Sequence, residues 1–312
     1  MGLQKTDSGH APCASRLGFE LRVMRGDFSG VRENYEAVDK TSSEFLGRSR
    51  IFLQGAIGSG DYPLFEQIVA DIRAYGQGDE SPQMNIRRQI ALAFVGVLLR
   101  VNREIPAWLD LGLPENVPAD SLGIVGYLAV RNFQRRYEMK MASVAAEFAA
   151  ALLTLEQHEV AKDIAVRLKV VQGEIGRDLE LKDLSERFFR KAVESLRQEG
   201  IILPFLDVAI SSNSALARIL REVDSRLFAE VQRKSKSYFR NVILFRNQWS
   251  GSSVPLTLSA RDFYIARALS HGMAYKDIAR HMDIAAGRMN YLVQRIYGQF
   301  NVHKRTEITI PW

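Results

Sequence analysis

The chain contains a single cysteine, Cys13, among its 312 residues. One thiol cannot form an internal disulfide, and disulfides are rare in proteins of the reducing cytoplasm. No run of about 18 uninterrupted apolar residues occurs, which excludes an ordinary transmembrane helix. The residues before position 16 are polar and lack the apolar segment of a signal peptide. We therefore expect a cytoplasmic protein without a membrane partner.

Signatures of enzymes are also missing from the sequence. The Gly-rich stretch 55–60, GAIGSG, lacks the Gly-Lys-Ser/Thr with which a P-loop holds phosphates, so we interpret it as a turn between helices. The histidines, at positions 10, 158, 271, 281 and 303, do not have the spacing of metal ligands. No Gly-x-Ser-x-Gly elbow occurs, and the chain lacks the alternating strands and helices of a phosphoacceptor domain. We expect no enzymatic activity, no cofactor and no metal site.

Strict alternation of apolar and polar residues, the mark of half-buried strands, is rare in this chain. Over residues 16–248 apolar residues recur instead at spacings of three and four, and the 46% hydrophobic and 25% charged residues are ordinary for a globular protein. The sequence therefore predicts an all-α protein. The predicted helices of this region span residues 16–25, 28–38, 42–56, 62–75, 84–101, 107–111, 122–136, 140–155, 158–172, 182–199, 210–220 and 224–247.

Two Gly-Asp pairs, at residues 26–27 and 60–61, each precede an aromatic residue and an amphipathic helix. Their offset of 34 residues is the period of the tetratricopeptide repeat, although Gly-Asp is also a generic helix break and start. We predict a solenoid of helical hairpins over residues 16–248, with an irregular helical bundle as the alternative. Residues 1–15 are expected to form a flexible tail.

Positive charge is concentrated at the C-terminal end. From residue 232 onward there are thirteen Lys and Arg and four acidic residues, which gives a net charge of +9. Since the whole chain has a net charge of +6, residues 1–231 have a net charge of −3. A basic C-terminal quarter on a mildly acidic body is expected if only that end meets nucleic acid.

Residues 258–307 contain three helical patterns separated by short breaks. Ser259 and Asp262 form a Ser-x-x-Asp helix start, and Gly272 stands where this helix ends. A second short helix fits residues 275–282 and a third fits residues 287–300. The third helix has an apolar stripe, formed by Met289, Val293, Ile296, Tyr297 and Phe300. Its outer face is polar and carries Arg288, Asn290, Tyr291, Gln294 and Arg295. This pattern is typical of a helix-turn-helix DNA reader.

At these positions the chain resembles the LuxR-type (GerE-like) helix-turn-helix family. The family pattern is retained at Leu258, Ser259, Arg261, Asp262, Leu269, Gly272, Lys276, Asp277, Ile278, Ala279, Ile284, Gly287, Ile296, Tyr297, Phe300, Val302 and Arg305. The resemblance implies a four-helix-type domain over residues 256–312 that binds double-stranded DNA. Residues 249–255, WSGSSVP, are then expected to be a flexible linker.

The resemblance also implies roles for individual side chains. Asn290, Tyr291 and Gln294 would reach base edges in the major groove, where amides pair well with adenine. Phosphate contacts, which position the helix without reading sequence, are expected from Lys276, Arg288, Arg295 and Lys304.

Several positions depart from the family pattern. Ala274 and Ala285 replace helix-capping Ser or Thr, and each lost cap costs about 1 kcal/mol. Asn290 replaces the usual Lys, and Leu292 replaces the usual His beside the phosphates. The family usually has a fourth helix that pairs two DNA-binding domains. Because Pro311 directly follows Thr309 and Ile310, we expect this last helix to be shortened. A homodimer would then form through the solenoid or Trp312.

The body resembles the tetratricopeptide-like arrays that precede the LuxR-type domain in MalT-like regulators, through its Gly-Asp helix starts and residues 191–205, KAVESLRQEGIILPF. This resemblance implies a bacterial transcriptional regulator whose body senses a small molecule or a protein partner. Candidate residues for a ligand groove are Trp108, Tyr127, Arg131 and Arg135, each of which also suits a structural role. The alternative is a protein-interaction scaffold with a degenerate helix-turn-helix that no longer reads DNA.

Overall fold

The computed structural model describes residues 11–42, 44–76, 81–111, 117–154, 159–208, 214–282 and 284–310. Within these ranges every regular element is a helix, and no strand occurs, so the prediction of an all-α protein is confirmed. No helix in this part of the chain has the length and apolar character needed to cross a membrane. Residues 1–10 of the predicted tail, the start of the predicted helix 210–220, and Trp312 lie outside the described residues.

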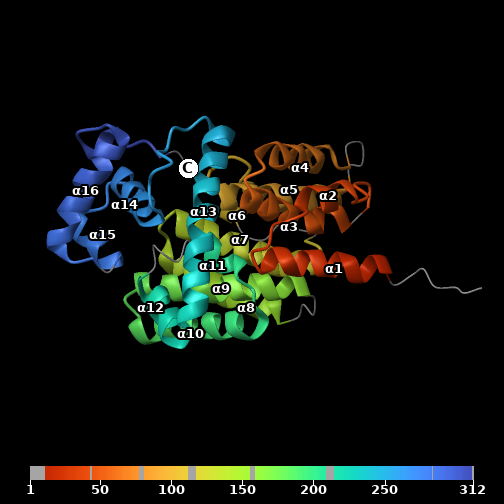
Figure 1. Cartoon of the computed structure of the whole chain (residues 1–312), viewed down its shortest axis with the longest axis horizontal. Coiled ribbons are helices and arrows are strands. Elements are labelled where there is room, and N and C mark those ends of the chain that lie inside the picture. The colour runs from red at the N-terminus through yellow and green to blue at the C-terminus, as the bar shows by residue number, and fades with distance from the viewer. Residues whose placement is uncertain are drawn as a thin grey trace, which may run out of the picture.

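The helical body is built from pairs of sequential helices (Figure 1). Its first part contains α1 (Ala11–Met24), α2 (Val31–Glu36), α3 (Glu44–Ser59), α4 (Tyr62–Ala74), α5 (Pro82–Leu99), α6 (Trp108–Leu111), the 3-10 turn η1 (Ala119–Ser121) and α7 (Leu122–Arg135). Its second part contains α8 (Met139–Leu153), α9 (Glu159–Asp178), α10 (Lys182–Glu199), α11 (Leu203–Asp207), α12 (Ser214–Val223) and α13 (Ser225–Ser250). Among sequential helices, the most extensive contacts join α7 to α8 and α9 to α10, followed by α8 to α9 and α3 to α4.

Both Gly-Asp pairs form the turns that the sequence predicts. Gly26 and Gly60 have positive φ angles of 70° and 78°, a conformation that glycine adopts without steric cost. Asp61 then caps α4, because its carboxylate accepts a hydrogen bond from the backbone N–H of Leu64 at 3.1 Å. The same carboxylate pairs with Arg32 at 2.7 Å, which joins α2 to the start of α4.

The interpretation of residues 55–60 as a turn is wrong for residues 55–59, which are helical, and holds only at Gly60. Helix α3 continues through Gly55 and Gly58 and stops at Ser59. A Cβ atom at Gly55 would lie 2.6 Å from the side chain of Val31, and one at Gly58 would lie 2.3 Å from the ring of Phe28. These two glycines therefore allow neighbouring segments to approach α3 closely.

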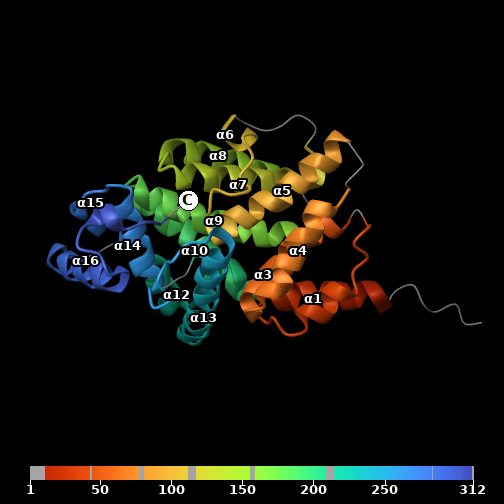
Figure 2. The same cartoon turned by 90° about the horizontal axis from the view of Figure 1, so that it is seen from above.

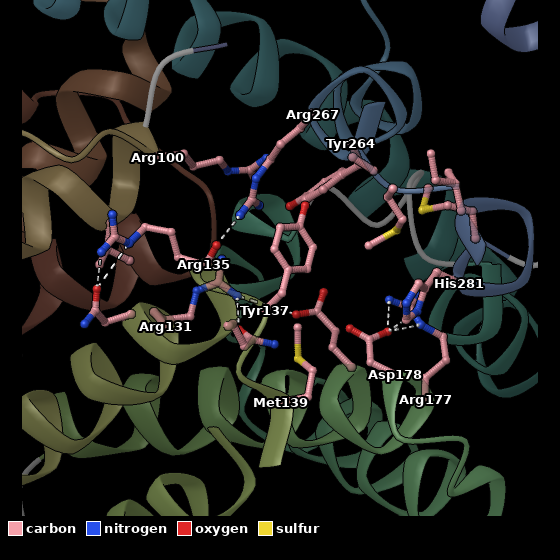
Figure 3. Close-up of a pocket in the computed structure, with 18 of the residues that line it drawn as sticks. Arg100, Arg131, Arg135, Tyr137, Met139, Arg177, Asp178, Tyr264, Arg267 and His281 are labelled. Atoms are coloured by element: carbon pink, nitrogen blue, oxygen red, sulfur yellow. Dashed lines mark hydrogen bonds and ion pairs between the residues drawn. The ribbon is translucent and has the colours of Figure 1, made fainter. Parts of the chain in front are cut away.

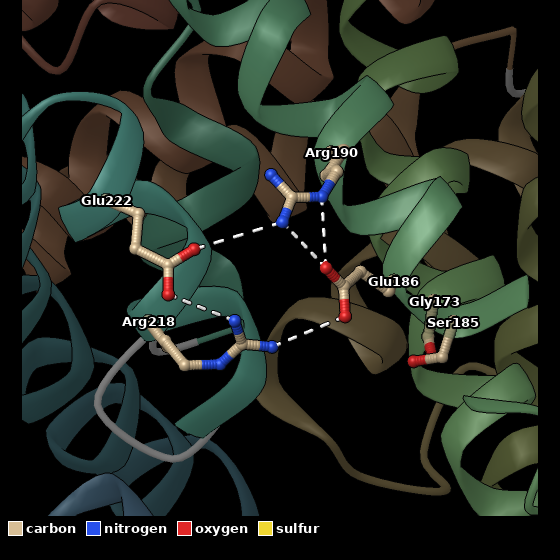
Figure 4. A network of polar contacts seen from close by, with 6 residues as sticks. All are labelled: Gly173, Ser185, Glu186, Arg190, Arg218 and Glu222. Atoms are coloured by element: carbon tan, nitrogen blue, oxygen red, sulfur yellow. Dashed lines mark hydrogen bonds and ion pairs between the residues drawn. The ribbon is translucent and has the colours of Figure 1, made fainter. Parts of the chain in front are cut away.

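Helix α9 likewise extends past its predicted end at residue 172 to Asp178. A Cβ atom at Gly173 would lie 2.4 Å from the ring of Phe189, so glycine lets α10 pack directly against α9. Ser185 donates a hydrogen bond to the carbonyl oxygen of Gly173 at 2.7 Å across the same contact (Figure 4). Farther along α10, an exposed network of ion pairs reaches α12 and is formed by Glu186, Arg190, Arg218 and Glu222 (Figure 4).

A buried group of charges ties three parts of the body together. Asp163 and Arg167, one turn apart on α9, are 0% and 2% exposed and pair at 3.0 Å. Arg167 also contacts the carboxylate of Asp207 at the end of α11, and Arg50 of α3 lies 3.8 Å from Asp163. Removing one partner of such a buried group is strongly destabilising, since the other charge stays in a poorly solvated interior.

The last body helix returns to the first ones. On α13, Asn241 donates to the carbonyl oxygen of Ile57 at 2.8 Å and Lys234 donates to that of Arg25 at 3.2 Å. In an extended solenoid each repeat contacts only its neighbours, whereas here the end of the body closes against its beginning (Figures 1 and 2). The tetratricopeptide-like repeat stays a prediction.

The C-terminal domain has its own core. It contains α14 (Ala260–Ser270), α15 (Tyr275–His281), α16 (Ala286–Phe300) and the 3-10 turn η3 (Arg305–Glu307). After α16 this turn is the one regular element in the described residues, as expected for a shortened last helix. Ile308 and Ile310 follow it, are 3% and 6% exposed, and belong to the core of this domain.

Helix α13 belongs to both cores. Val231 and Phe245 pack in the body, whereas Phe239 and Ile243 pack in the core of the C-terminal domain. Near the end of α13, the side-chain amide of Asn247 accepts from the backbone N–H of Val254 at 3.1 Å and donates to its carbonyl oxygen at 2.7 Å. Val254 is 2% exposed, so the segment predicted as a linker is bonded back onto the end of α13.

Candidate nucleic-acid interface

The start of α14 is organised by the predicted Ser259–Asp262 pattern. The hydroxyl of Ser259 accepts a hydrogen bond from the backbone N–H of Asp262 at 3.1 Å and donates to its carboxylate at 2.7 Å. Asp262 is 3% exposed, and its second carboxylate oxygen accepts a hydrogen bond from Arg295 of α16. The helix start therefore also fixes how α16 lies against α14.

The relation between α15 and α16 is fixed by side chains on their inner faces. The hydroxyls of Tyr275 and Tyr297 lie 3.1 Å apart. Burial and the hydrogen bond with Tyr275 raise the pKa of Tyr297 to about 12, so this hydroxyl keeps its proton at neutral pH. Ala274 and Ala285 stand at the N-caps of α15 and α16 without a side-chain cap, as the sequence indicates.

The outer face of α16 is exposed and polar. Arg288, Asn290 and Gln294 are all exposed, and Tyr291 is 65% exposed although it is a large aromatic residue. The opposite face carries the predicted apolar stripe. Leu292, which replaces the usual His of the family, is 0% exposed and belongs to the core of the domain.

The basic residues expected at phosphates have different surroundings. Arg288 and Lys276 are exposed, at the beginnings of α16 and α15. Lys304, also exposed, lies 3.6 Å from the carboxylate of Glu307. Arg295 is partly exposed and forms an ion pair with Asp262, so its charge already has a partner within the domain.

The body holds the C-terminal domain through α14 and α15. Arg280 pairs with Glu180 at 2.8 Å, and Nδ1 of His281 lies 3.2 Å from a carboxylate oxygen of Asp178. The rings of Tyr137 and His271 meet edge to face with centroids 5.4 Å apart. Figures 1 and 2 both show α14 between α16 and the body, so that α16 lies at the outer end of the molecule.

Two body residues at this junction have positive φ angles. Tyr137, after α7, has φ 60° and Glu180, after α9, has φ 63°. A non-glycine residue in this region costs roughly 1–2 kcal/mol. The surrounding contacts outweigh this cost, and the two strained turns bring Tyr137 and Glu180 against the C-terminal domain.

The four candidate groove residues do not share one site. The indole Nε1 of Trp108 donates to Gln89 at 2.6 Å, and Tyr127 is 4% exposed within the body core. Arg131 and Arg135 do line a common cavity, between the body and the C-terminal domain (Figure 3). Further residues of this cavity, which the sequence did not reveal, include Arg100, Arg177, Asp178, Tyr264, Arg267 and His281.

The sequence profile of the GerE family, described as bacterial regulatory proteins of the luxR family, matches residues 256–311. Comparison with curated proteins and with solved structures gave no match. The match begins just before the Ser259–Asp262 helix start, includes both helices of the helix-turn-helix, and reaches the buried Ile310. Residues 256–311 are therefore a LuxR-family helix-turn-helix domain, the DNA-binding part of a transcription regulator.

Proposed function

We propose that this protein is a cytoplasmic bacterial regulator in which α16 enters the major groove of promoter DNA while the helical body senses a small molecule or a protein partner. The observation that carries the proposal is the polar, exposed outer face of α16, at the end of the molecule that is farthest from the body. An amphipathic recognition helix whose apolar face is already buried has its polar face available for base edges.

Within this proposal, Asn290 and Gln294 read bases, because an amide pairs bidentately with adenine. Tyr291 lies on the same exposed face and contacts the groove with its ring. Arg288 and Lys276 neutralise phosphates and so set the position of α16 without reading sequence. Lys304 contributes a further positive charge at the edge of the same surface.

Arg295 acts differently from the other basic residues in this proposal. Its guanidinium bonds to Asp262, which is almost fully buried at the start of α14. We assign it mainly to holding α16 at the correct angle, and only secondarily to the phosphate expected from the family resemblance. Its loss would then affect the domain itself as well as binding.

The proposal is tested by selecting fragments from a random double-stranded DNA pool with the full chain, and by measuring affinity for the selected fragments at increasing salt. We expect the affinity to fall steeply with salt, because phosphate neutralisation releases counterions. Absent or salt-insensitive binding would overturn the proposal.

A pull-down from bacterial lysate with and without nuclease separates the regulator from an interaction scaffold. Loss of co-purified partners after nuclease treatment supports the regulator, whereas their persistence, together with absent DNA binding, supports a scaffold. Sedimentation of the full chain with and without a selected fragment measures whether a homodimer occupies two half-sites.

A further inference from the structure

A cavity of about 140 Å³ lies where α5, α7 and α9 of the body meet α14 and α15 of the DNA-binding domain (Figure 3). An engineered cavity of roughly 150 Å³ in another protein holds one benzene molecule. The space therefore suits one small organic molecule, and any such molecule would contact both parts of the chain.

Positive charge exceeds negative charge around this cavity. Among its lining residues in the described part of the chain are five arginines and two carboxylates. Asp178 accepts from Arg177 at 3.2 Å and approaches His281 at the same distance. Glu174 lies 3.5 Å from Arg131. The two carboxylates thus stand beside Arg177 and Arg131, and the excess positive charge lies around Arg100, Arg135 and Arg267.

Arg100 has a buried donor that lacks an acceptor. Its side chain is 4% exposed; one terminal nitrogen donates to the carbonyl oxygen of Asp207 at 2.6 Å, and the other, Nη1, is buried without a hydrogen-bond partner. Its guanidinium also lies 4.8 Å from the centroid of the Tyr264 ring. A buried polar group is normally hydrogen-bonded, so this cation indicates a missing acceptor on the side of the cavity.

Arg267 and Arg135, which line the same cavity as Arg100, also contribute positive charge. Burial, together with the positive charges of Arg100 and Arg131, lowers the pKa of Arg267 to about 10. At neutral pH Arg267 remains protonated, and an anion in the cavity would offset the repulsion among these guanidinium groups. Arg135 bonds through its side chain to the amide oxygen of Asn132, at 2.6 Å, which is a neutral acceptor.

The rest of the lining is apolar or aromatic. Tyr137 and Tyr264 present rings to the cavity, and Arg100 and Arg135 lie to the left of them in Figure 3. Met139, Met273 and Met282 also line the cavity. Methionine side chains adapt easily to the shape of a partner, so the tyrosines and methionines together suit an apolar group.

We propose that this cavity binds a small organic carboxylate, with the carboxylate group between Arg100 and Arg135 and the apolar group against the tyrosines and methionines. The proposal rests on the proposed function, since it names the effector class and places it at the junction with the DNA-binding domain. Because the ligand contacts both parts, it favours the arrangement in which they are closed on each other, and DNA and ligand affinities are coupled.

The test uses the full chain with benzoate as the probe and benzamide as its uncharged counterpart of the same shape. Benzoate at about 10 mM should raise the Tm by about 2–5 °C, and benzamide should raise it far less. Equal effects of the two compounds, or no effect of benzoate at matched ionic strength, would overturn the proposal. This comparison needs no variant.

Variants then place the site. Arg100→Gln and Arg135→Gln should each weaken benzoate binding at least about tenfold, as measured by calorimetry. Arg240→Gln on α13, exposed and not part of the cavity lining, is the matched control and should bind as the unmodified protein does. Unchanged binding in both cavity variants would count against this site.

The outcomes also separate this proposal from the proposed function. Salt-sensitive DNA binding without any benzoate effect would refute the carboxylate site alone. Benzoate binding by a chain that fails to bind DNA would refute the regulator alone while supporting the site. Where both hold, benzoate should change the affinity for a selected DNA fragment, and this change should be lost in Arg135→Gln.

Discussion

The rings of Phe239 and Phe263 meet edge to face, with centroids 5.7 Å apart, although Phe239 belongs to the last helix of the body and Phe263 to the first helix of the DNA-binding domain. Both are buried, at 4% and 0% exposure. The guanidinium of Arg100 lies within 5.6 Å of both ring centroids. The junction is therefore a packed and charged contact between α13, α14 and the end of α5.

Phe239→Ala should destabilise the DNA-binding domain more than the body. Removing a buried phenylalanine typically costs about 3–5 kcal/mol, because apolar contacts are lost and a cavity remains. Hydrogen exchange resolved along the sequence should show the loss of protection in α14–α16. Phe148→Ala is the matched control, since Phe148 is 49% exposed and should change little. Equal effects of both substitutions would contradict the shared core.

Arg295→Ala should lower the free energy of unfolding of the domain by about 1–3 kcal/mol, since it leaves the buried Asp262 carboxylate without its charged donor. Urea denaturation measures this loss. Arg288→Ala should leave stability unchanged and instead reduce the salt dependence of DNA binding by about one phosphate contact. If Arg295→Ala weakened DNA binding without destabilising the protein, its positioning role would be refuted.

Gln294→Ala should relax the sequence preference of DNA binding. A bidentate amide–adenine pair discriminates against the wrong base by about 1–3 kcal/mol. Selection from a random DNA pool by the variant and by the unmodified protein gives the comparison. Gln299→Ala, on a less exposed part of the same helix, is the control. Identical selected sequences for Gln294→Ala and the unmodified protein would remove Gln294 from the set of base contacts.

Ala274→Ser and Ala285→Ser should each stabilise the domain by about 0.5–1 kcal/mol. Both positions are N-caps in extended or nearly extended backbone without a side-chain cap, and a serine hydroxyl there accepts a hydrogen bond from the first turn. The increase is read from the urea midpoint at unchanged slope. Ala286→Ser, one position inside α16, should not stabilise it.

Lowering the pH from about 7.5 to about 5.5 should reduce stability in part through His271. Burial and the nearby charge of Arg267 lower the pKa of His271 from its ordinary value of 6.5. The unfolded chain then binds a proton more readily than the folded one, so stability is full above pH 6.5 and falls below it. His271→Gln should flatten this dependence, and His303→Gln, at an exposed position, should not.

Sequence reasoning located the helix-turn-helix well because its signals are local. Apolar residues at helical spacing, Ser259 at the start of α14 and Gly272 after its end all act within one or two turns. Gly272 has φ 78°, a conformation that L-residues rarely adopt, and the helix ends there as predicted.

Glycines within the body misled the same reasoning. The sequence around Gly55 and Gly173 predicts a turn or a helix end, yet both lie inside helices. What decides their conformation is a close contact with Val31 in one case and with Phe189 in the other. Such contacts depend on how helices pack, which the spacing along one helix does not reveal.

The candidate sites divide in the same way. The exposed face of α16 follows from helical periodicity, so Asn290, Tyr291 and Gln294 were assigned to it from sequence. Two residues of the cavity at the junction, Arg131 and Arg135, were predicted from the sequence, because they lie one turn apart on α7. Arg100 and Arg267 come from distant helices, and only the packed fold brings them to the same place.

Because α13 packs in both cores, the segment that matches the family is shorter than the segment that forms the complete core of the DNA-binding domain. The family match starts at residue 256, but the core that it specifies is completed by Phe239 and Ile243. If residues 256–311 were fused to another protein, the apolar side chains that pack against Phe239 and Ile243 would be exposed. A fusion that begins before Phe239 would keep these side chains buried. Any event that shifts α13 within the body must also move the wall of the DNA-binding domain, so this one helix couples the body mechanically to that domain.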